Sequence, residues 1–130
     1  MDEPRLVIFD MAGTTVRDAG CVAEAFLGAL REHGFEVTSA KGLGFERIPE
    51  GAATEPILFK LGVDAYANSN KADALVMSCG ALKTLDLIVP LEQEIKAPVV
   101  SSTPHGLMNA VRLLGVSPRS PGFGAVLSKA

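Results

Sequence analysis

Cys79 lies between a buried apolar run and a helical pattern, in the segment Ser78-Cys79-Gly80. A thiol at a helix start meets backbone N–H groups without partners and the positive end of the helix dipole, and both favour the thiolate. The same amides, with Gly80 permitting close approach, can hold a carboxylate or enolate oxygen. Such a thiol can give or take a proton at a carbon next to a carboxylate without a cofactor. The alternative is plain packing, since small buried cysteines are common at strand ends.

Short apolar runs alternate with helical patterns along the chain, which predicts β-α units around a parallel sheet. The expected strands are residues 6–9, 36–40, 74–77 and 98–100. The expected helices run from about residue 22 to Gly34, onward from a cap at Thr54, through 82–87 and 91–95 with a kink or break at Pro90, and from a cap at Thr103-Pro104 to Gly115. Residues 117–130 are expected to form an irregular tail.

These units predict one α/β domain over residues 1–130: a single open parallel sheet of about four strands with helices on both faces, flavodoxin-like or Rossmann-like. In such sheets ligands bind beyond the carboxyl ends of the strands. Asp10, Cys79 and the pair Ser101-Ser102 follow the first, third and fourth expected strands. The sequence therefore predicts that these polar groups meet at one edge of the sheet.

Composition narrows the classes of partner. The net charge is −3, the isoelectric point is about 5.3 and the basic residues are scattered, so neither nucleic acid nor an anionic membrane is an expected partner. The start of the chain carries no signal-peptide pattern, and no apolar run reaches the ~18 residues of a membrane span. We expect a cytoplasmic protein in which Cys21 and Cys79 are separate thiols.

Residues 74–127, ALVMSCGALKTLDLIVPLEQEIKAPVVSSTPHGLMNAVRLLGVSPRSPGFGAVL, resemble the C-terminal part of the arylmalonate decarboxylases. These enzymes belong to the aspartate/glutamate racemase superfamily, together with maleate cis-trans isomerase. The SCG, TLD, PVVSS and AVRL segments carry the resemblance. Residues 42–45 and the helix after them fit more loosely, so the resemblance extends over about residues 36–130.

The resemblance implies a decarboxylase or isomerase acting on a small carboxylate through an enediolate, with no metal or organic cofactor. It makes Cys79 the proton donor and gives Gly80 an oxyanion-binding amide. Substrate-binding positions would be Ser78, Gly80, Ala81, Ser101 and Ser102, although strand termination or helix capping explains the last two equally well. The family builds its site between two similar lobes, and this sequence resembles one of them, so we expect a homodimer or a partner with a second lobe. Cys21 does not match the family's second cysteine and is expected to pack at a helix start.

A second resemblance covers residues 5–35. The run RLVIFDMAGTT (5–15) is similar to motif one of the haloacid dehalogenase superfamily in its phosphonatase-like form, which implies Asp10 as a nucleophile and Mg²⁺ ligand. The later acidic pair of that superfamily has no counterpart, because Asp64 and Asp73 precede the third strand and Asp86 lies in a helix. A junction is expected between residues 18 and 39. The alternatives are thus a Mg²⁺-dependent phosphohydrolase or a non-catalytic α/β remnant, in which Asp10 stabilises its loop.

The chain has two histidines, for which the sequence suggests different roles. His105 follows Thr103-Pro104 and can act as a second proton-transfer group across the strand ends, whereas a histidine at a helix start is more often exposed and without a role. His33, beside Gly34, is expected to favour the negative end of its helix.

Overall fold

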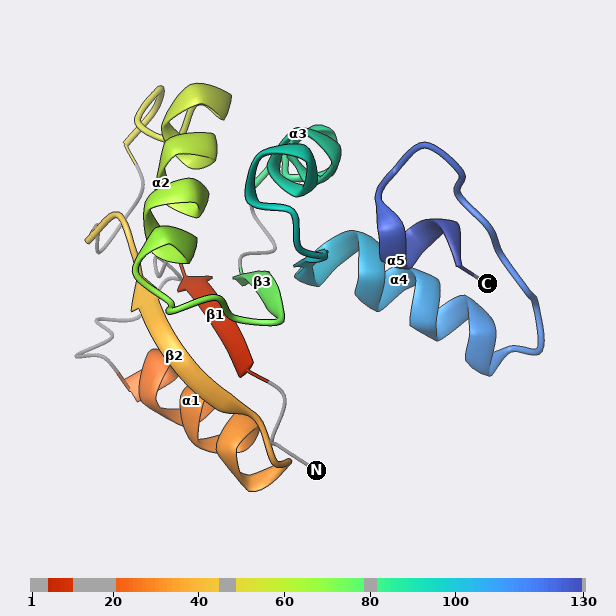
Figure 1. Cartoon of the computed structure of the whole chain (residues 1–130). Helices are drawn as coiled ribbons and strands as arrows, with labels where there is room; N and C mark the ends of the chain where they lie inside the picture. Colours follow the sequence, from red (N-terminus) through yellow and green to blue (C-terminus); the bar gives the residue numbers. More distant parts are fainter. Residues whose placement is uncertain (1–4, 11–20, 45–48, 79–81, 130) are drawn as a thin grey trace.

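The computed structural model describes residues 5–10, 21–44, 49–78 and 82–129, in which strands and helices alternate (Figure 1). The strands are β1 (Arg5–Asp10), β2 (Glu36–Lys41), β3 (Ala74–Ser78) and β4 (Val99–Ser101). The helices are α1 (Cys21–Glu32), α2 (Glu55–Ala67), α3 (Leu85–Ile95), α4 (Ser102–Leu113) and α5 (Ala125–Ser128).

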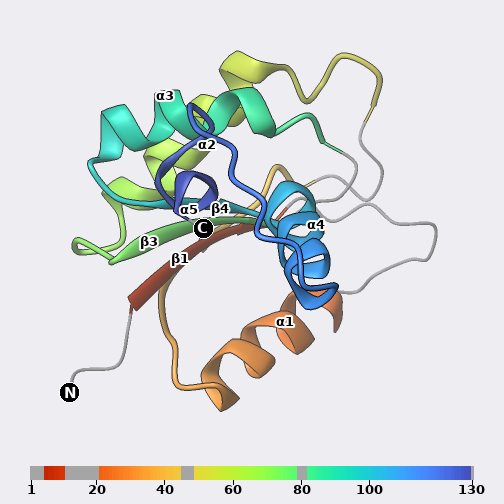
Figure 2. The same cartoon turned by 90° about the vertical axis from the view of Figure 1, so that its right-hand side faces the viewer.

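The strands form a four-stranded sheet in the order β2-β1-β3-β4, with every neighbouring pair parallel. Parallel neighbours need crossover connections, and α1, α2 and α3 supply them. α1 packs on β2 on one face of the sheet, whereas α2 and α3 cover the other (Figure 2). The predicted open parallel α/β sheet with helices on both faces is confirmed.

The core lies between the sheet and the helices α2 and α3. Leu75 and Met77, alternate residues of β3, are buried, and so are Ile88 and Leu91 of α3. Gly62 allows α2 to approach α3, because a Cβ atom there would lie 3.0 Å from Cδ2 of Leu91. This packing holds the central strands in place and fixes where their carboxyl ends lie.

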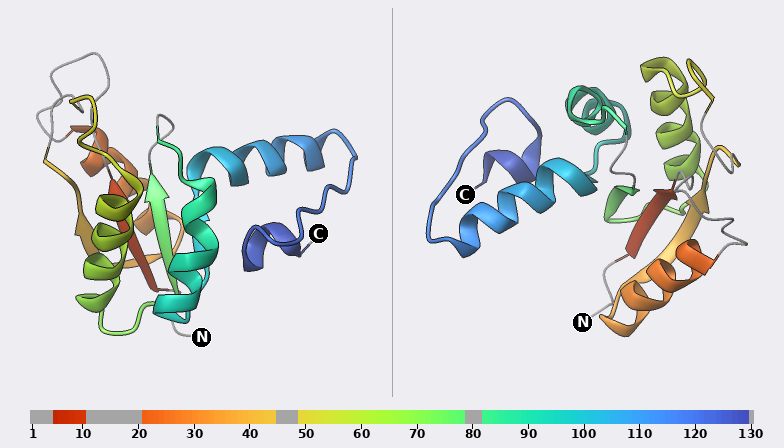
Figure 3. Two further views of the ribbon diagram at one scale, coloured as in Figure 1. Left: turned by 90° about the horizontal axis from the view of Figure 1, so that it is seen from above. Right: turned by 180° about the vertical axis from the view of Figure 1, so that it is seen from behind.

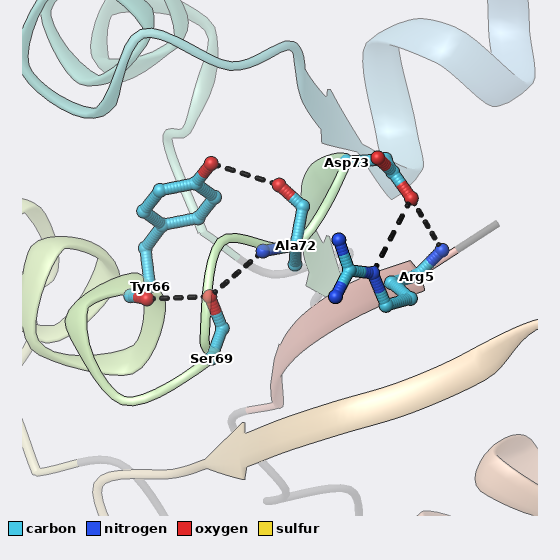
Figure 4. Close-up of polar contacts among 5 residues, drawn as sticks. All are labelled: Arg5, Tyr66, Ser69, Ala72 and Asp73. Atoms are coloured by element: carbon cyan, nitrogen blue, oxygen red, sulfur yellow. Dashed lines mark hydrogen bonds and ion pairs between the residues drawn. The ribbon is translucent and has the colours of Figure 1, made fainter.

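Polar contacts organise the opposite, amino-terminal edge of the sheet (Figure 4). The Ser69 hydroxyl donates to the carbonyl of Tyr66 at 2.6 Å, and the Tyr66 hydroxyl donates to the carbonyl of Ala72 at 2.8 Å. Arg5 and Asp73 exchange hydrogen bonds: the Arg5 amide donates to the Asp73 carboxylate at 2.7 Å, and the Asp73 amide donates to the Arg5 carbonyl at 2.8 Å. These contacts fix the turn between α2 and β3 and the start of β1.

α3 differs from its prediction in two respects. It begins at Leu85 rather than residue 82, and it continues unbroken through Pro90. Pro90 is exposed, so its missing N–H costs one hydrogen bond, while Leu87, Ile88 and Leu91 stay buried on the inner side. Burial of that inner side holds the helix together across the proline.

The other helix boundaries also shift. α4 begins at Ser102, directly after β4, so Ser101 and not Thr103 occupies the N-cap position. Thr54 stands at the N-cap of α2 as predicted, but its side chain makes no capping hydrogen bond. The expected irregular tail contains α5, whose first amide, that of Ala125, donates to the carboxylate of Glu92 at 2.9 Å. A contact from α3 therefore caps this short helix.

Candidate functional site

The carboxyl ends of β1, β3 and β4 lie side by side. Asp10 pairs with Ser78 across β1 and β3, and Met77 pairs with Ser101 across β3 and β4. The positions of Asp10 and Ser101 therefore lie on one edge of the sheet as predicted, together with Ser78, whereas the prediction for Cys79 is not tested. The side chain of Asp10 and the whole of residues 79–81, which include Cys79, lie outside the described part of the structure.

Three residues form a hydrogen-bonded cluster behind this edge, which we call the Thr84–Ser101–His105 cluster. The hydroxyl oxygens of Thr84 and Ser101 lie 2.5 Å apart, and both side chains are buried. Nδ1 of His105 lies 3.0 Å from the amide nitrogen of Ser101 and 2.9 Å from its carbonyl oxygen. The cluster thus ties the start of α3 and the first turns of α4 to the end of β4.

His105 is half-buried, so the expectation of an exposed histidine without contacts is wrong. Its Nε2 is buried and has no hydrogen-bond partner among the described residues. Burial lowers the pKa of His105 from its ordinary 6.5, against the opposing effects of the Ser101 hydrogen bond and of Glu92. The imidazole is therefore mainly neutral at pH 7. Nδ1 then either accepts from the Ser101 amide or donates to the Ser101 carbonyl, depending on the tautomer.

The three predicted serines, Ser78, Ser101 and Ser102, have different surroundings. Ser101 is fully buried, and its hydroxyl already pairs with Thr84. Ser102 is exposed and opens α4, and Ser78 is half-buried at the end of β3. Of these three hydroxyls, those of Ser78 and Ser102 are the ones without a buried side-chain partner in the described part of the chain. Thr84 was not predicted as a site residue. The one sequence feature that points to it is its position directly before the apolar helix α3.

The environment predicted for Cys79 needs one correction. Because α3 begins at Leu85, the first turn of that helix lies further along the chain than the expected start at residue 82. The helix dipole acts within about one turn of the terminus, so the argument from the dipole weakens. The predicted anion-binding amides belong to residues 79–81, which lie outside the described residues. Cys21 begins α1 as predicted, and its side chain lies outside the described residues.

The structure also bears on metal binding, on membrane-spanning helices and on the acidic residues Asp64 and Asp73. Within residues 5–10, 21–44, 49–78 and 82–129, no group of three or more His, Cys, Asp or Glu is arranged to hold a metal ion. None of the helices described is both long and apolar enough to cross a membrane. Asp73, considered above for an acidic pair, instead binds Arg5 at the amino-terminal edge. Asp64 binds Lys60 on the exposed side of α2, and this hydrogen bond lowers the pKa of Asp64.

Comparison with known proteins identifies relatives that match most of this chain. A family model described as arylmalonate decarboxylase matches residues 13–127. The chain is 34% identical over 110 residues to arylmalonate decarboxylase of Bordetella bronchiseptica, covering 83% of this chain and 46% of that protein. It also aligns with the structure of a sulfate-associated arylmalonate decarboxylase mutant, with a TM-score of 0.83 and 30% identity over 97% of this chain and 52% of that one.

A more distant neighbour shows the same fold. The maleate isomerase of Pseudomonas putida S16 superposes with a TM-score of 0.76 and 23% identity, over 96% of this chain and 48% of that one. The chain therefore spans about half the length of the proteins it matches.

The match to the decarboxylase family begins at residue 13, ahead of the junction expected between residues 18 and 39. It includes α1 but not β1, so most of the run RLVIFDMAGTT (5–15) lies ahead of the match, and the resemblance to the haloacid dehalogenase superfamily stays a prediction. With a family model that covers most of its length and a fold shared with solved members, this chain belongs to the arylmalonate decarboxylase family.

Proposed function

We propose that this chain is one lobe of a cofactor-independent enzyme that decarboxylates or isomerises a small carboxylate, with Cys79 as the proton donor. The proposal is carried by the family match, whose bounds, residues 13–127, include Ser78-Cys79-Gly80 between β3 and α3. The relative with the matching sequence is named for decarboxylation of arylmalonates, which makes malonates with an aryl substituent the first substrates to test.

The proposed reaction balances without a cofactor. The bond between the α-carbon and one carboxyl group breaks, CO₂ leaves, and the electron pair stays on the substrate as an enediolate. We assign the backbone amides of Gly80 and Ala81 to the enediolate oxygens, where hydrogen bonds stabilise developing charge. The Cys79 thiol gives its proton to the α-carbon, and the thiolate regains a proton from water. An isomerase would use the same thiol on an unsaturated carboxylate.

The serines at the carboxyl ends of the strands have different proposed roles. Ser78 and Ser102 are proposed to hydrogen-bond the substrate carboxylates, since neither hydroxyl is taken by a buried partner in the described part of the chain. Ser101 is proposed as a positioning residue, because its hydroxyl is held by Thr84 and its backbone by His105. Because relatives are about twice as long, we assign the other side of the substrate to a second lobe, supplied by another copy of this chain.

Turnover in deuterated water tests the proposal. The wild-type chain and the Cys21→Ser variant are expected to release CO₂ from an arylmalonate and to place one deuterium on the α-carbon of the product. Cys79→Ser should lose at least about a hundredfold in rate, the contribution typical of a positioned proton donor. Equal rates for wild type and Cys79→Ser would contradict the proposal, and so would the absence of turnover by a dimeric wild-type chain.

A further inference from the structure

The outward side of α4 carries an apolar stripe. Exposed residues recur there at spacings of three and four, which places them on one side of a helix. The stripe, called the α4 stripe below, consists of Thr103, Gly106, Leu107, Ala110, Leu113 and Leu114. Its three leucines are 67%, 82% and 81% exposed in chain order. Isolated exposed leucines are ordinary, whereas a row of them along one helix is not.

No charge interrupts the stripe. Arg112 is the one Lys, Arg, Asp or Glu in α4, and its guanidinium donates to the carbonyl of Lys129 at 2.7 Å, away from the stripe. His105 is likewise turned inward, toward Ser101. α4 and the segment that follows it project from the β4 edge of the sheet (Figure 3). The stripe therefore faces away from the described core.

An apolar hollow continues this surface. It has a volume of about 280 Å³ and lies between α4 and the segment leading to α5, with Leu107, Val111, Pro118 and Phe123 among its lining. Val116 and Phe123 are also exposed beside the stripe. Exposed apolar side chains that gather in this way mark surfaces that bind another molecule more often than surfaces left in water.

We infer that a second copy of this chain docks on the α4 stripe, with the two α4 helices antiparallel about a two-fold axis near Ala110. Such a contact is isologous, so one patch must complement itself, and a neutral row of leucines does so without like-charge repulsion. Gly106 and Ala110 leave room for close approach, since a Cβ on Gly106 would meet nothing within 4 Å. A standard interface buries about 800 Å² per partner, so the contact would also have to cover the apolar hollow and the exposed Val116 and Phe123 beside the stripe.

The inference deepens the proposed function and rests on it in one respect, the need for a second lobe beside the site. α4 begins at Ser102, directly after the carboxyl end of β4. A copy docked along α4 therefore borders the edge where Ser78 and Ser101 lie. The oligomeric state is measured without substrate, so its outcome is separate from that of the turnover experiment.

Sedimentation velocity of the full chain tests the inference. The wild type is expected to sediment as a dimer at micromolar concentration, and Leu107→Glu with Leu114→Glu should weaken association at least tenfold and give the monomer mass. Both substitutions are at exposed positions, so the thermal unfolding midpoint should stay within a few degrees. Ile57→Glu, at an exposed apolar position on α2, is the matched control and should stay dimeric.

A cross-link tests the geometry and does not depend on charged substitutions. Ala110→Cys in a Cys21→Ser background should form an interchain disulfide on mild oxidation, since a two-fold axis near this position brings its two copies together. Ala67→Cys, at the exposed end of α2, should not. A wild-type chain that stays monomeric, a dimer that persists with both leucines replaced, or equal cross-linking at the two positions would each overturn the inference. In the first case the occupant of the stripe would be a different chain.

Discussion

Thr84 and Ser101 occupy the N-cap positions of α3 and α4, yet neither side chain caps its helix. The two hydroxyls bind each other instead, in a buried contact between segments far apart in the sequence. A buried hydroxyl without a partner costs about 1–3 kcal/mol, so each depends on the other. Ser101 is therefore better explained as a link between α3 and β4 than as a direct ligand of the substrate.

The lowered pKa of His105 predicts a pH dependence of stability. A histidine whose pKa is lower in the folded than in the unfolded chain stabilises the fold while it is neutral, above the unfolded value of about 6.5. That stabilisation is lost as the pH falls below 6.5 and through the folded pKa, because the unfolded chain binds the proton more tightly. The free energy of unfolding, measured in urea, should therefore fall between pH 7 and pH 5.

Two substitutions test whether His105 causes the expected pH dependence of stability. His105→Gln should flatten the change between pH 7 and pH 5, since the titrating group is removed. The chain's other histidine, His33, is exposed beyond the end of α1, and His33→Gln should leave the profile as in the wild type. A profile that is unchanged in His105→Gln would show that the buried imidazole is not the group responsible.

At the scale of the elements, strands could be predicted closely and helix boundaries less well. The apolar runs of β1 and β3 carry their own signal, because strands covered on both faces are continuously apolar. Thr84 and Ser101, which directly precede α3 and α4, bind each other, and no local pattern in the sequence reveals that contact. α5 escaped prediction for the same reason: its amide at Ala125 is held by Glu92 of α3.

The contact between α2 and α3 gives a prediction about packing. Gly62→Ala would place a Cβ 3.0 Å from Cδ2 and 3.3 Å from Cδ1 of Leu91, which is fully buried and has little room to move. Overpacking of about 1–3 kcal/mol should outweigh the gain of about 1 kcal/mol in helix propensity. Urea denaturation should show a net loss of about 1 kcal/mol.

Gly28→Ala is the matched control for this substitution. Gly28 lies inside α1, and a Cβ there would meet nothing within 4 Å. The change should raise the free energy of unfolding by up to about 1 kcal/mol, from helix propensity alone. If both variants gained stability, α2 and α3 would not be packed as closely as described.

At the scale of the whole molecule, the open parallel sheet and the shared edge of its strand ends followed from the alternation of strands and helices, whereas the strand order β2-β1-β3-β4 is seen only in the structure. The environment of Cys79 did not follow from that alternation, because it depends on the connection between β3 and α3 and, in the proposed function, on a second copy of the chain. His105 likewise owes its burial to contacts that only the assembled α4 and β4 create. Local sequence patterns therefore do not predict the burial and hydrogen bonds of site residues that depend on tertiary contacts.

Protection of Cys79 from alkylation tests the central claim most directly, because it needs binding but not turnover. The Cys21→Ser chain, in which Cys79 is the only thiol, is treated with iodoacetamide at a dimer-forming concentration, with and without an arylmalonate. If Cys79 stands in a small-carboxylate site, a saturating arylmalonate should slow alkylation at least about tenfold, equivalent to about 1.4 kcal/mol, whereas a neutral ester of the same compound should not. Equal alkylation rates with and without the dicarboxylate would contradict the account.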